Sequence, residues 1–181
     1  MSGIQHVTLL GLMGSGKSSV GRELAALLGW PLSDSDEVIE REQGATVREL
    51  SERLGVDAMH GFEAEHLLGA LSAPEQSVVC AAASVVDDDR CREALKRPDV
   101  FVVWLEVNAG RLAARFASGP HRPVFDPDAE RMFQRQLAER GLLFAQVADL
   151  RVRADRGDAA RVAARVAKVP RVAKVLKTPA R

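Results

Sequence analysis

The most constraining feature of this sequence is a glycine-rich octapeptide near its start. Residues 11–18, Gly-Leu-Met-Gly-Ser-Gly-Lys-Ser, match the pattern G-x-x-x-x-G-K-[S/T]. They follow a short apolar segment, residues 6–10, and precede residues 17–28, in which apolar side chains recur at helical spacing. A glycine-rich loop between a strand and a helix turns its backbone N–H groups toward an anion. The sequence therefore predicts binding of a nucleoside triphosphate.

The residue types in this loop predict how the phosphates are held. Lys17 would reach the β- and γ-phosphates, and the Ser18 hydroxyl would bind Mg²⁺. The other residues expected at the nucleotide are Gly11, Gly14, Ser15, Gly16 and Ser19.

Downstream of the loop, strand-like and helical patterns alternate. After residues 6–10, strands are expected to end near 33–36 and to cover 78–82, 100–105 and 150–152. Helices are expected at residues 17–28, 47–54, 58–71, 88–95, 111–116, 129–146 and 158–169, with a loop at 118–127. The alternation predicts an α/β fold: a three-layer α/β/α sandwich around a parallel sheet of about five strands. We expect one domain, residues 1–168, followed by a frayed basic tail, residues 169–181.

The composition and charge of the chain limit the classes of protein and of binding partner to consider. The 181 residues are 46% hydrophobic and 28% charged with a formal net charge of zero, which excludes a disordered or collagen-like chain. Residues 161–181 hold seven basic residues and no acidic one, a charge pattern that could attract an anionic partner. They lack aromatic residues, however, so we interpret this stretch as solvated, with neither a nucleic-acid nor a membrane partner. Cys80 and Cys91 are too few for a disulfide framework and fit a reducing compartment. A cytoplasmic monomer is expected.

An acidic pair stands about sixteen residues beyond the phosphate loop. Asp34 and Asp36 flank Ser35, and Val-Ile-Glu follows at residues 38–40. If both acids lie on the end of one strand, they point the same way, so that one can serve a metal and the other a nucleophile.

From about residue 5 to residue 168 the chain resembles small phosphate-loop kinases of the nucleoside-monophosphate-kinase fold, and among them the shikimate kinase family. The resemblance rests on the loop, the acidic pair and the motifs described next. It implies that ATP and Mg²⁺ are used, that Asp34 helps to hold Mg²⁺, and that Asp36 contacts the acceptor hydroxyl and takes its proton. It also implies a role in aromatic amino acid biosynthesis.

The resemblance extends to a lid at about residues 115–126. Residues 115–123, Arg-Phe-Ala-Ser-Gly-Pro-His-Arg-Pro, look like the mobile segment of the family. This implies that Arg115 lies near the adenine and phosphates and that Arg122 stabilises the transferring phosphoryl group. The stretch around Arg156, residues 155–158, resembles the loop that contacts adenine.

The acceptor side, about residues 34–66 with Arg140, departs from the family in three places. Arg140 stands where the family binds the carboxylate of shikimate, and Glu63 is kept. His60 replaces a second carboxylate-binding arginine, Met59 replaces an aromatic residue, and alanines at 81–83 replace three glycines. The expected acceptor residues are Asp36, His60, Glu63, Ala82 and Arg140.

Two interpretations of the acceptor follow. Either the chain converts ATP and shikimate to ADP and 3-phosphoshikimate in an unusual pocket, or it phosphorylates another small hydroxylated acceptor, such as a sugar acid, a cyclitol or a nucleotide. Outside enzymes, the alternative is a nucleotide-binding regulator without turnover. The retained Asp36 and Arg122 argue against that alternative, since binding alone needs neither.

Overall fold

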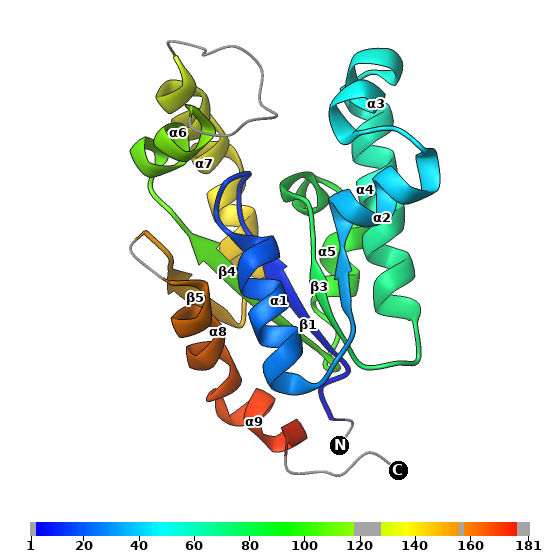
Figure 1. Ribbon diagram of the computed structural model, residues 1–181, viewed down its shortest axis with the longest axis vertical. Helices are drawn as coiled ribbons and strands as arrows, with labels where there is room; N and C mark the ends of the chain where they lie inside the picture. Colours follow the sequence, from blue (N-terminus) through cyan, green and yellow to red (C-terminus); the bar gives the residue numbers. More distant parts are fainter. Residues whose placement is uncertain (1–2, 118–127, 156–157, 177–181) are drawn as a thin grey trace.

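The computed structural model describes residues 3–117, 128–155 and 158–176. Its core is one sheet of five parallel strands, as predicted, and the strand order is β2-β3-β1-β4-β5 (Figure 1). The strands are β1 (His6–Leu10), β2 (Leu32–Asp34), β3 (Ser77–Cys80), β4 (Val100–Glu106) and β5 (Leu150–Arg153). The first strand along the chain is therefore the central one, and the phosphate loop leaves the sheet at its middle.

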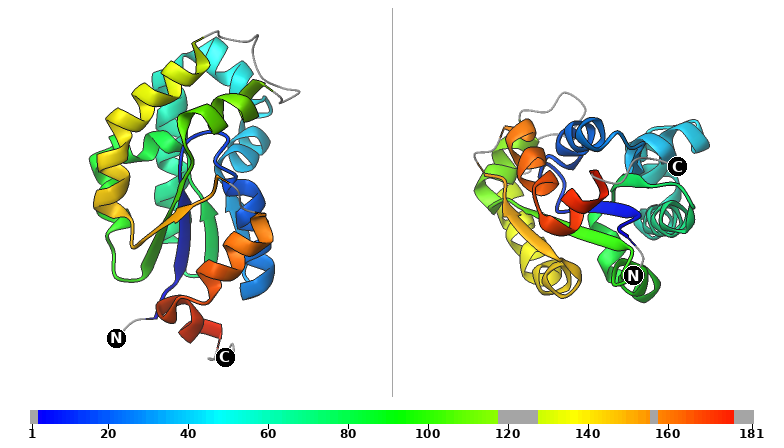
Figure 2. Two further views of the ribbon diagram at one scale, coloured as in Figure 1. Left: turned by 90° about the vertical axis from the view of Figure 1, so that its left-hand side faces the viewer. Right: turned by 90° about the horizontal axis from the view of Figure 1, so that it is seen from below.

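Helices cover both faces of the sheet and form a three-layer sandwich (Figure 2). On one face lie α1 (Lys17–Leu28) and α8 (Ala159–Ala167); on the other lie α5 (Asp89–Leu95) and α7 (Ala129–Val147), with α4 (Val56–Ser72) beside β3. The remaining elements are α2 (Ser35–Gln43), α3 (Val47–Leu54), the 3₁₀ turn η1 (Ala83–Asp87), α6 (Ala109–Ala117) and α9 (Pro170–Leu176). None of the helices in the described ranges is long and apolar enough to cross a membrane.

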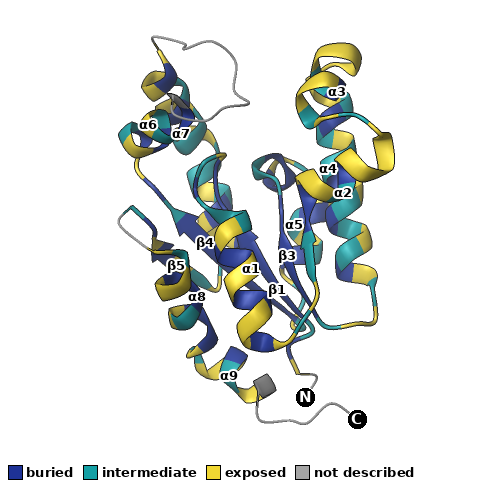
Figure 3. Ribbon diagram, in the orientation of Figure 1, coloured by how far each residue is buried: buried dark blue, intermediate teal, exposed yellow. Residues whose placement is uncertain are grey.

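The central strands are buried on both faces, which explains their unbroken apolar sequences. Every residue of β1 and β3 is buried, and β4 is buried except for its last residue, Glu106 (Figure 3). Parallel strands covered by helices on both sides need no polar alternation. This burial is the reason that the strands could be predicted from continuous apolar segments of the sequence.

Several boundaries match the prediction to the residue. The strand at 6–10 and the helices at 17–28 and 47–54 are confirmed, and the other predicted elements differ from the observed ones by a few residues at their ends. The second strand, β2, stops at Asp34, within the range in which its end was expected. The predicted loop at 118–127 lies outside the described residues.

The prediction that the chain frays after Pro170 is wrong for residues 170–176, which form α9. Val172 is fully buried there. Arg171 donates to Asp149 at 2.5 Å and lies over the ring of Phe101 at 5.3 Å. A seven-residue helix is not stable alone, so these contacts with the body of the fold hold it in place.

Candidate active site

The phosphate loop leaves β1 in a conformation that requires glycine. Gly11 has φ +151°, and a Cβ atom there would lie 2.7 Å from both the carbonyl oxygen of Leu105 and the hydroxyl of Ser15. Gly16, the residue before α1, has φ +94° in the left-handed region. The loop therefore turns tightly enough to aim its amides and the start of α1 at one point, as the motif predicts.

Lys17 crosses the mouth of this loop. Its Nζ donates to the carbonyl oxygens of Gly11 at 2.8 Å and Leu12 at 3.2 Å. Burial lowers the pKa of Lys17, and the negative charge of Asp36 opposes that shift. The ammonium group is thus held against the loop by two carbonyl oxygens, and Asp36 is close enough to attract it.

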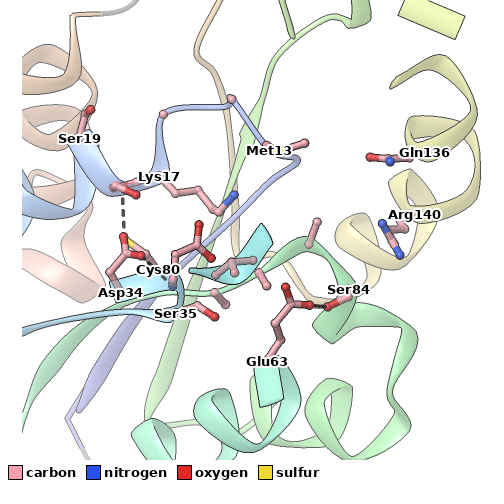
Figure 4. A pocket seen from close by; sticks show the side chains of 18 of the residues that line it. Met13, Lys17, Ser19, Asp34, Ser35, Glu63, Cys80, Ser84, Gln136 and Arg140 are labelled. Atoms are coloured by element: carbon pink, nitrogen blue, oxygen red, sulfur yellow. Dashed lines mark hydrogen bonds between the residues drawn. The ribbon is translucent and has the colours of Figure 1, made fainter. Parts of the chain in front are cut away.

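One cavity of about 520 Å³ opens at the carboxyl ends of β1, β2 and β3, the edge at which parallel sheets bind ligands. The predicted residues that line it are Gly14, Gly16, Lys17, Ser18, Ser19, Asp34, Asp36, His60, Glu63, Ala82, Arg115 and Arg140. Figure 4 shows Lys17 and Asp34 on one side, Glu63 and Ser84 below, and Gln136 and Arg140 on the far wall. Residues of both the nucleotide side and the acceptor side therefore share one space.

Two predicted residues of the described part of the chain lie elsewhere. Gly11 and Ser15 are buried within the loop itself and do not line the cavity. Ser15 contributes its backbone N–H to the turn, bonding the carbonyl of Leu12 at 3.1 Å. Arg122 and Arg156 lie outside the described residues.

The two acids reach the cavity by a different route from the one predicted. Asp34 ends β2 and caps α2, its Oδ1 accepting from the Asp36 N–H at 3.2 Å, so Asp36 belongs to the first turn of a helix. The prediction of both acids on one strand end is wrong, yet both still face the cavity. Surrounding protein raises the pKa of Asp36 above its ordinary value, and Lys17 partly offsets the shift. A carboxylate held this way is a stronger proton acceptor than an exposed one.

A magnesium ion fits the residues beside the loop. The Oδ2 of Asp34 is buried and has no hydrogen-bond partner among the described atoms, although a buried carboxylate oxygen normally has one. Ser18 lines the same cavity. Mg²⁺ typically takes one or two protein oxygens and completes its shell with phosphates and water, so Asp34 and Ser18 supply a suitable pair.

On the acceptor side, α4 brings His60 and Glu63 to the cavity from one helix face. The Ser84 hydroxyl donates to Oε2 of Glu63. Burial raises the pKa of Glu63, and Ser84, His60 and Arg140 partly offset that shift. Glu63 is therefore a desolvated acid held in place by a hydroxyl group.

Two arginines approach from the opposite wall. Arg115 donates through Nη1 to the carbonyl of Gly14 at 2.9 Å and through Nη2 to the carbonyl of Ala154 at 3.1 Å, which ties α6 to the phosphate loop. Arg140 lines the cavity from α7, but part of its guanidinium is engaged by Asp87. Arg115 thus lies beside the phosphate loop, and Arg140 lies on the wall of the shared cavity.

The alanine triplet fits its backbone without strain. Ala82 has φ −63° and ψ 157°, and no residue other than glycine has positive φ within the described ranges. All three alanines line the cavity and follow β3, which ends at Cys80 instead of continuing to Ala82 as predicted. Their methyl groups occupy space that glycine would leave open. Cys80 itself donates to the Lys17 carbonyl at 3.3 Å, and burial raises the pKa of its thiol.

Sequence reasoning missed several residues that line the cavity. The missed residues are Met13, Ser35, Val47, Cys80, Ser84 and Gln136. Gln136 could have been found, because it lies four residues before Arg140 and so shares its helix face. Val47 and Ser84 carry no such signal, because only the packing of α3 and η1 brings them to the site.

Comparison with known proteins agrees with this geometry. A family model described as shikimate kinase matches residues 13–170. The shikimate kinase of Symbiobacterium thermophilum is 35% identical over 154 residues, 83% of this chain and 87% of that protein. The shikimate kinase of Corynebacterium efficiens is 36% identical over 148 residues, 81% of this chain and 85% of that protein.

A solved structure extends the likeness to three dimensions. Shikimate kinase from Acinetobacter baumannii in complex with shikimate has a TM-score of 0.83 at 29% identity, with 90% of each chain covered. That of Bacteroides thetaiotaomicron has a TM-score of 0.79 at 23% identity, which shows the fold alone. Because the family model matches residues 13–170, most of the chain, this protein belongs to the shikimate kinase family.

Proposed function

We propose that this protein is a shikimate kinase that transfers the γ-phosphoryl group of ATP to a hydroxyl of shikimate. The products are ADP and 3-phosphoshikimate. The single observation that carries the proposal is the shared cavity. Lys17 of the phosphate loop and Asp34, which is suited to bind Mg²⁺, line the same space as Asp36, Glu63 and Arg140. The relatives described above, and the shikimate-bound neighbour, support shikimate as the acceptor.

On the nucleotide side, the loop amides and the start of α1 hold the phosphates. Lys17 exchanges its two carbonyl partners for β- and γ-phosphate oxygens, a step aided by the incomplete stabilisation of its charge in the free protein. Ser18 and Asp34 hold Mg²⁺, which neutralises charge on the phosphates when it is bound. Arg115 and, by resemblance, Arg122 and Arg156 complete the nucleotide side.

On the acceptor side, Asp36 is placed to orient and deprotonate the hydroxyl. As the bond from the hydroxyl oxygen to phosphorus forms, the hydroxyl proton passes to the Asp36 carboxylate and the bond to the ADP oxygen breaks. The raised pKa of Asp36 suits a group that must accept a proton and release it later. Arg140 binds the acceptor carboxylate, with His60, Glu63 and Ala82 forming the remaining wall.

The test is ADP release by purified protein with Mg²⁺-ATP, with and without shikimate, and the mass of the product. We expect release that depends on shikimate and a product heavier by one phosphoryl group. Asp36→Asn should lower kcat by about 10²–10⁴-fold while ATP binding is retained. Tight ATP binding with no response to shikimate would overturn the proposal.

A panel of sugar acids, cyclitols and nucleoside monophosphates in the same assay addresses the other acceptors. The gluconokinase from Sinorhizobium meliloti has a TM-score of 0.55 at 20% identity, a likeness that shows the fold alone. Since the curated relatives are shikimate kinases, we expect the highest kcat/KM with shikimate.

The cellular setting follows from two thiols. Cys80 and Cys91 are both free and buried, and burial raises the pKa of Cys91 to about 11. Unpaired inert thiols fit a reducing compartment, so we infer a cytoplasmic location. A shikimate kinase would act in aromatic amino acid biosynthesis, and we propose that this one acts as a monomer.

A further inference from the structure

The 3₁₀ turn η1 holds two oppositely charged residues that come from two different helices. Ser84, near its start, donates to Glu63 of α4, and Asp87, at its end, accepts from Arg140 of α7. Figure 4 shows Glu63 and Ser84 in contact below the cavity and Arg140 on the adjoining wall. One short turn after β3 thus sets both an acid and a guanidinium of the acceptor side.

The Asp87–Arg140 contact uses only one edge of the guanidinium. Arg140 donates through Nε and Nη2 to Oδ2 of Asp87, at 2.9 and 2.6 Å, and Nε also lies 3.2 Å from Oδ1. Within the described part of the chain, no bond is formed by Nη1. The edge formed by Nη1 and Nη2 therefore remains for a ligand, and this edge can accept a carboxylate with two parallel bonds.

Burial distinguishes this ion pair from an ordinary surface pair. The Arg140 side chain is 17% exposed, whereas the arginines of the pairs Arg48–Glu52 and Arg22–Glu37 are more than half exposed. A long side chain on a cavity wall has many rotamers in the absence of a partner, and fixing one of them before binding removes that cost from acceptor recognition. Asp87 supplies this fixed orientation.

We propose that Asp87 is a positioning residue for acceptor recognition: it holds the Nε–Nη2 edge of Arg140 so that the Nη1–Nη2 edge meets the carboxylate of the acceptor. The inference rests on the proposed function, because it assigns the acceptor a carboxylate. Asp87 itself does not line the cavity and touches the acceptor only through Arg140. Its negative charge also opposes an anionic acceptor, but at 41% exposure that repulsion is screened by solvent.

The test is steady-state kinetics of Asp87→Ala with each substrate varied in turn. We expect KM for shikimate to rise about tenfold, with kcat and KM for ATP within about twofold of wild type. The KM of Asp87→Asn for shikimate should lie between those of wild type and Asp87→Ala, because its carboxamide oxygen can still accept one hydrogen bond from Arg140. Asp89→Ala is the matched control: Asp89 pairs with Arg92 outside the cavity, and its loss should leave KM for shikimate unchanged.

A double-mutant cycle separates positioning from a general structural role. Once Arg140 is replaced by alanine, the further change Asp87→Ala should leave KM for shikimate unchanged. Circular dichroism melting curves check that each variant is folded, and Asp87→Asn serves if the alanine variant is not.

The possible outcomes are distinct. An active wild type whose Asp87 variants keep its KM for shikimate, or lower it, overturns the inference and leaves the proposed function intact. A wild type that phosphorylates no shikimate overturns the proposed function and the inference with it.

Discussion

Three ionisable side chains line the cavity, and the charged form of each is less stable there than in water. Burial lowers the pKa of Lys17 and raises those of Asp36 and Glu63. Desolvation therefore acts against the ionised form of all three groups, and the attraction between Lys17 and the acids restores only part of the loss. A site that strips water from its charged groups is prepared to bind charged substrates, at some expense of stability in the free protein.

Glu63 allows that expense to be measured. Because its folded-state pKa is raised above the ordinary value of 4.5, its penalty is absent below that value and grows as the pH rises toward and through the folded-state pKa. Glu63→Gln keeps an acceptor for Ser84 and removes the charge. We expect the variant to melt at a higher temperature than wild type at about pH 8 and at the same temperature near pH 4. A difference that does not change with pH would contradict this account.

His60 tests how the cavity recognises an anion. An arginine there would add a permanent charge and two parallel donors on α4, across the cavity from Arg140. A charge-assisted bond contributes about 1.5–3 kcal/mol, so His60→Arg should lower KM for shikimate by about one to two decades. His60→Gln, which adds no charge, is the control and should leave KM nearly unchanged. Equal effects of the two variants would mean that position 60 acts through shape alone.

At the scale of elements, the position of the phosphate loop depends on how closely α1 approaches the sheet. Gly21 faces the sheet from α1, and a Cβ atom there would lie 2.4 Å from the Cys80 sulfur and 3.0 Å from a methyl group of Leu32. A glycine inside a helix is unfavourable by about 1 kcal/mol relative to alanine, so its presence here reflects the short distance between α1 and β3.

Gly21→Ala should therefore force α1 away from the sheet, lower the stability by about 1–3 kcal/mol and weaken ATP binding. Adding Cys80→Ala removes the clashing sulfur, so the double variant should recover a large part of both losses. The measurements are urea unfolding and ATP titration of the four proteins of this cycle. Purely additive effects would show that the sulfur contact does not limit the packing of α1.

The elements that sequence reasoning missed are those built by tertiary contacts. The central strands and α1 follow from unbroken or periodic apolar residues. By contrast, α2 buries only Ser35 and Ile39 and depends on the Asp34 cap, and α9 depends on Arg171 and Val172 docking on the body. Neither has an apolar stripe long enough to stand out in the sequence.

For the whole molecule, the same contrast divides the two halves of the site. The phosphate-binding part of the nucleotide half lies on one continuous strand–loop–helix unit, so its residues could be predicted from their spacing in the sequence. The acceptor half is assembled from α2, α4, η1 and α7, which are far apart in sequence, and resemblance to a family was needed to connect them. The Asp87–Arg140 pair, 53 positions apart, has no signature in a single sequence.

Because the nucleotide half includes the central strand and α1, its ligand should stabilise the entire fold. At about 100 times its Kd, Mg²⁺-ATP adds about 2.7 kcal/mol, or a rise in Tm of about 5–10 °C for a protein of this size. Lys17→Met should lose most of the rise, whereas Asp36→Asn, which changes only the acceptor side, should keep it. Excess EDTA should reduce the rise and abolish turnover, because Asp34 and Ser18 then face the phosphates without Mg²⁺. Differential scanning fluorimetry of the three proteins decides this, and a full ATP shift in Lys17→Met would place the nucleotide elsewhere.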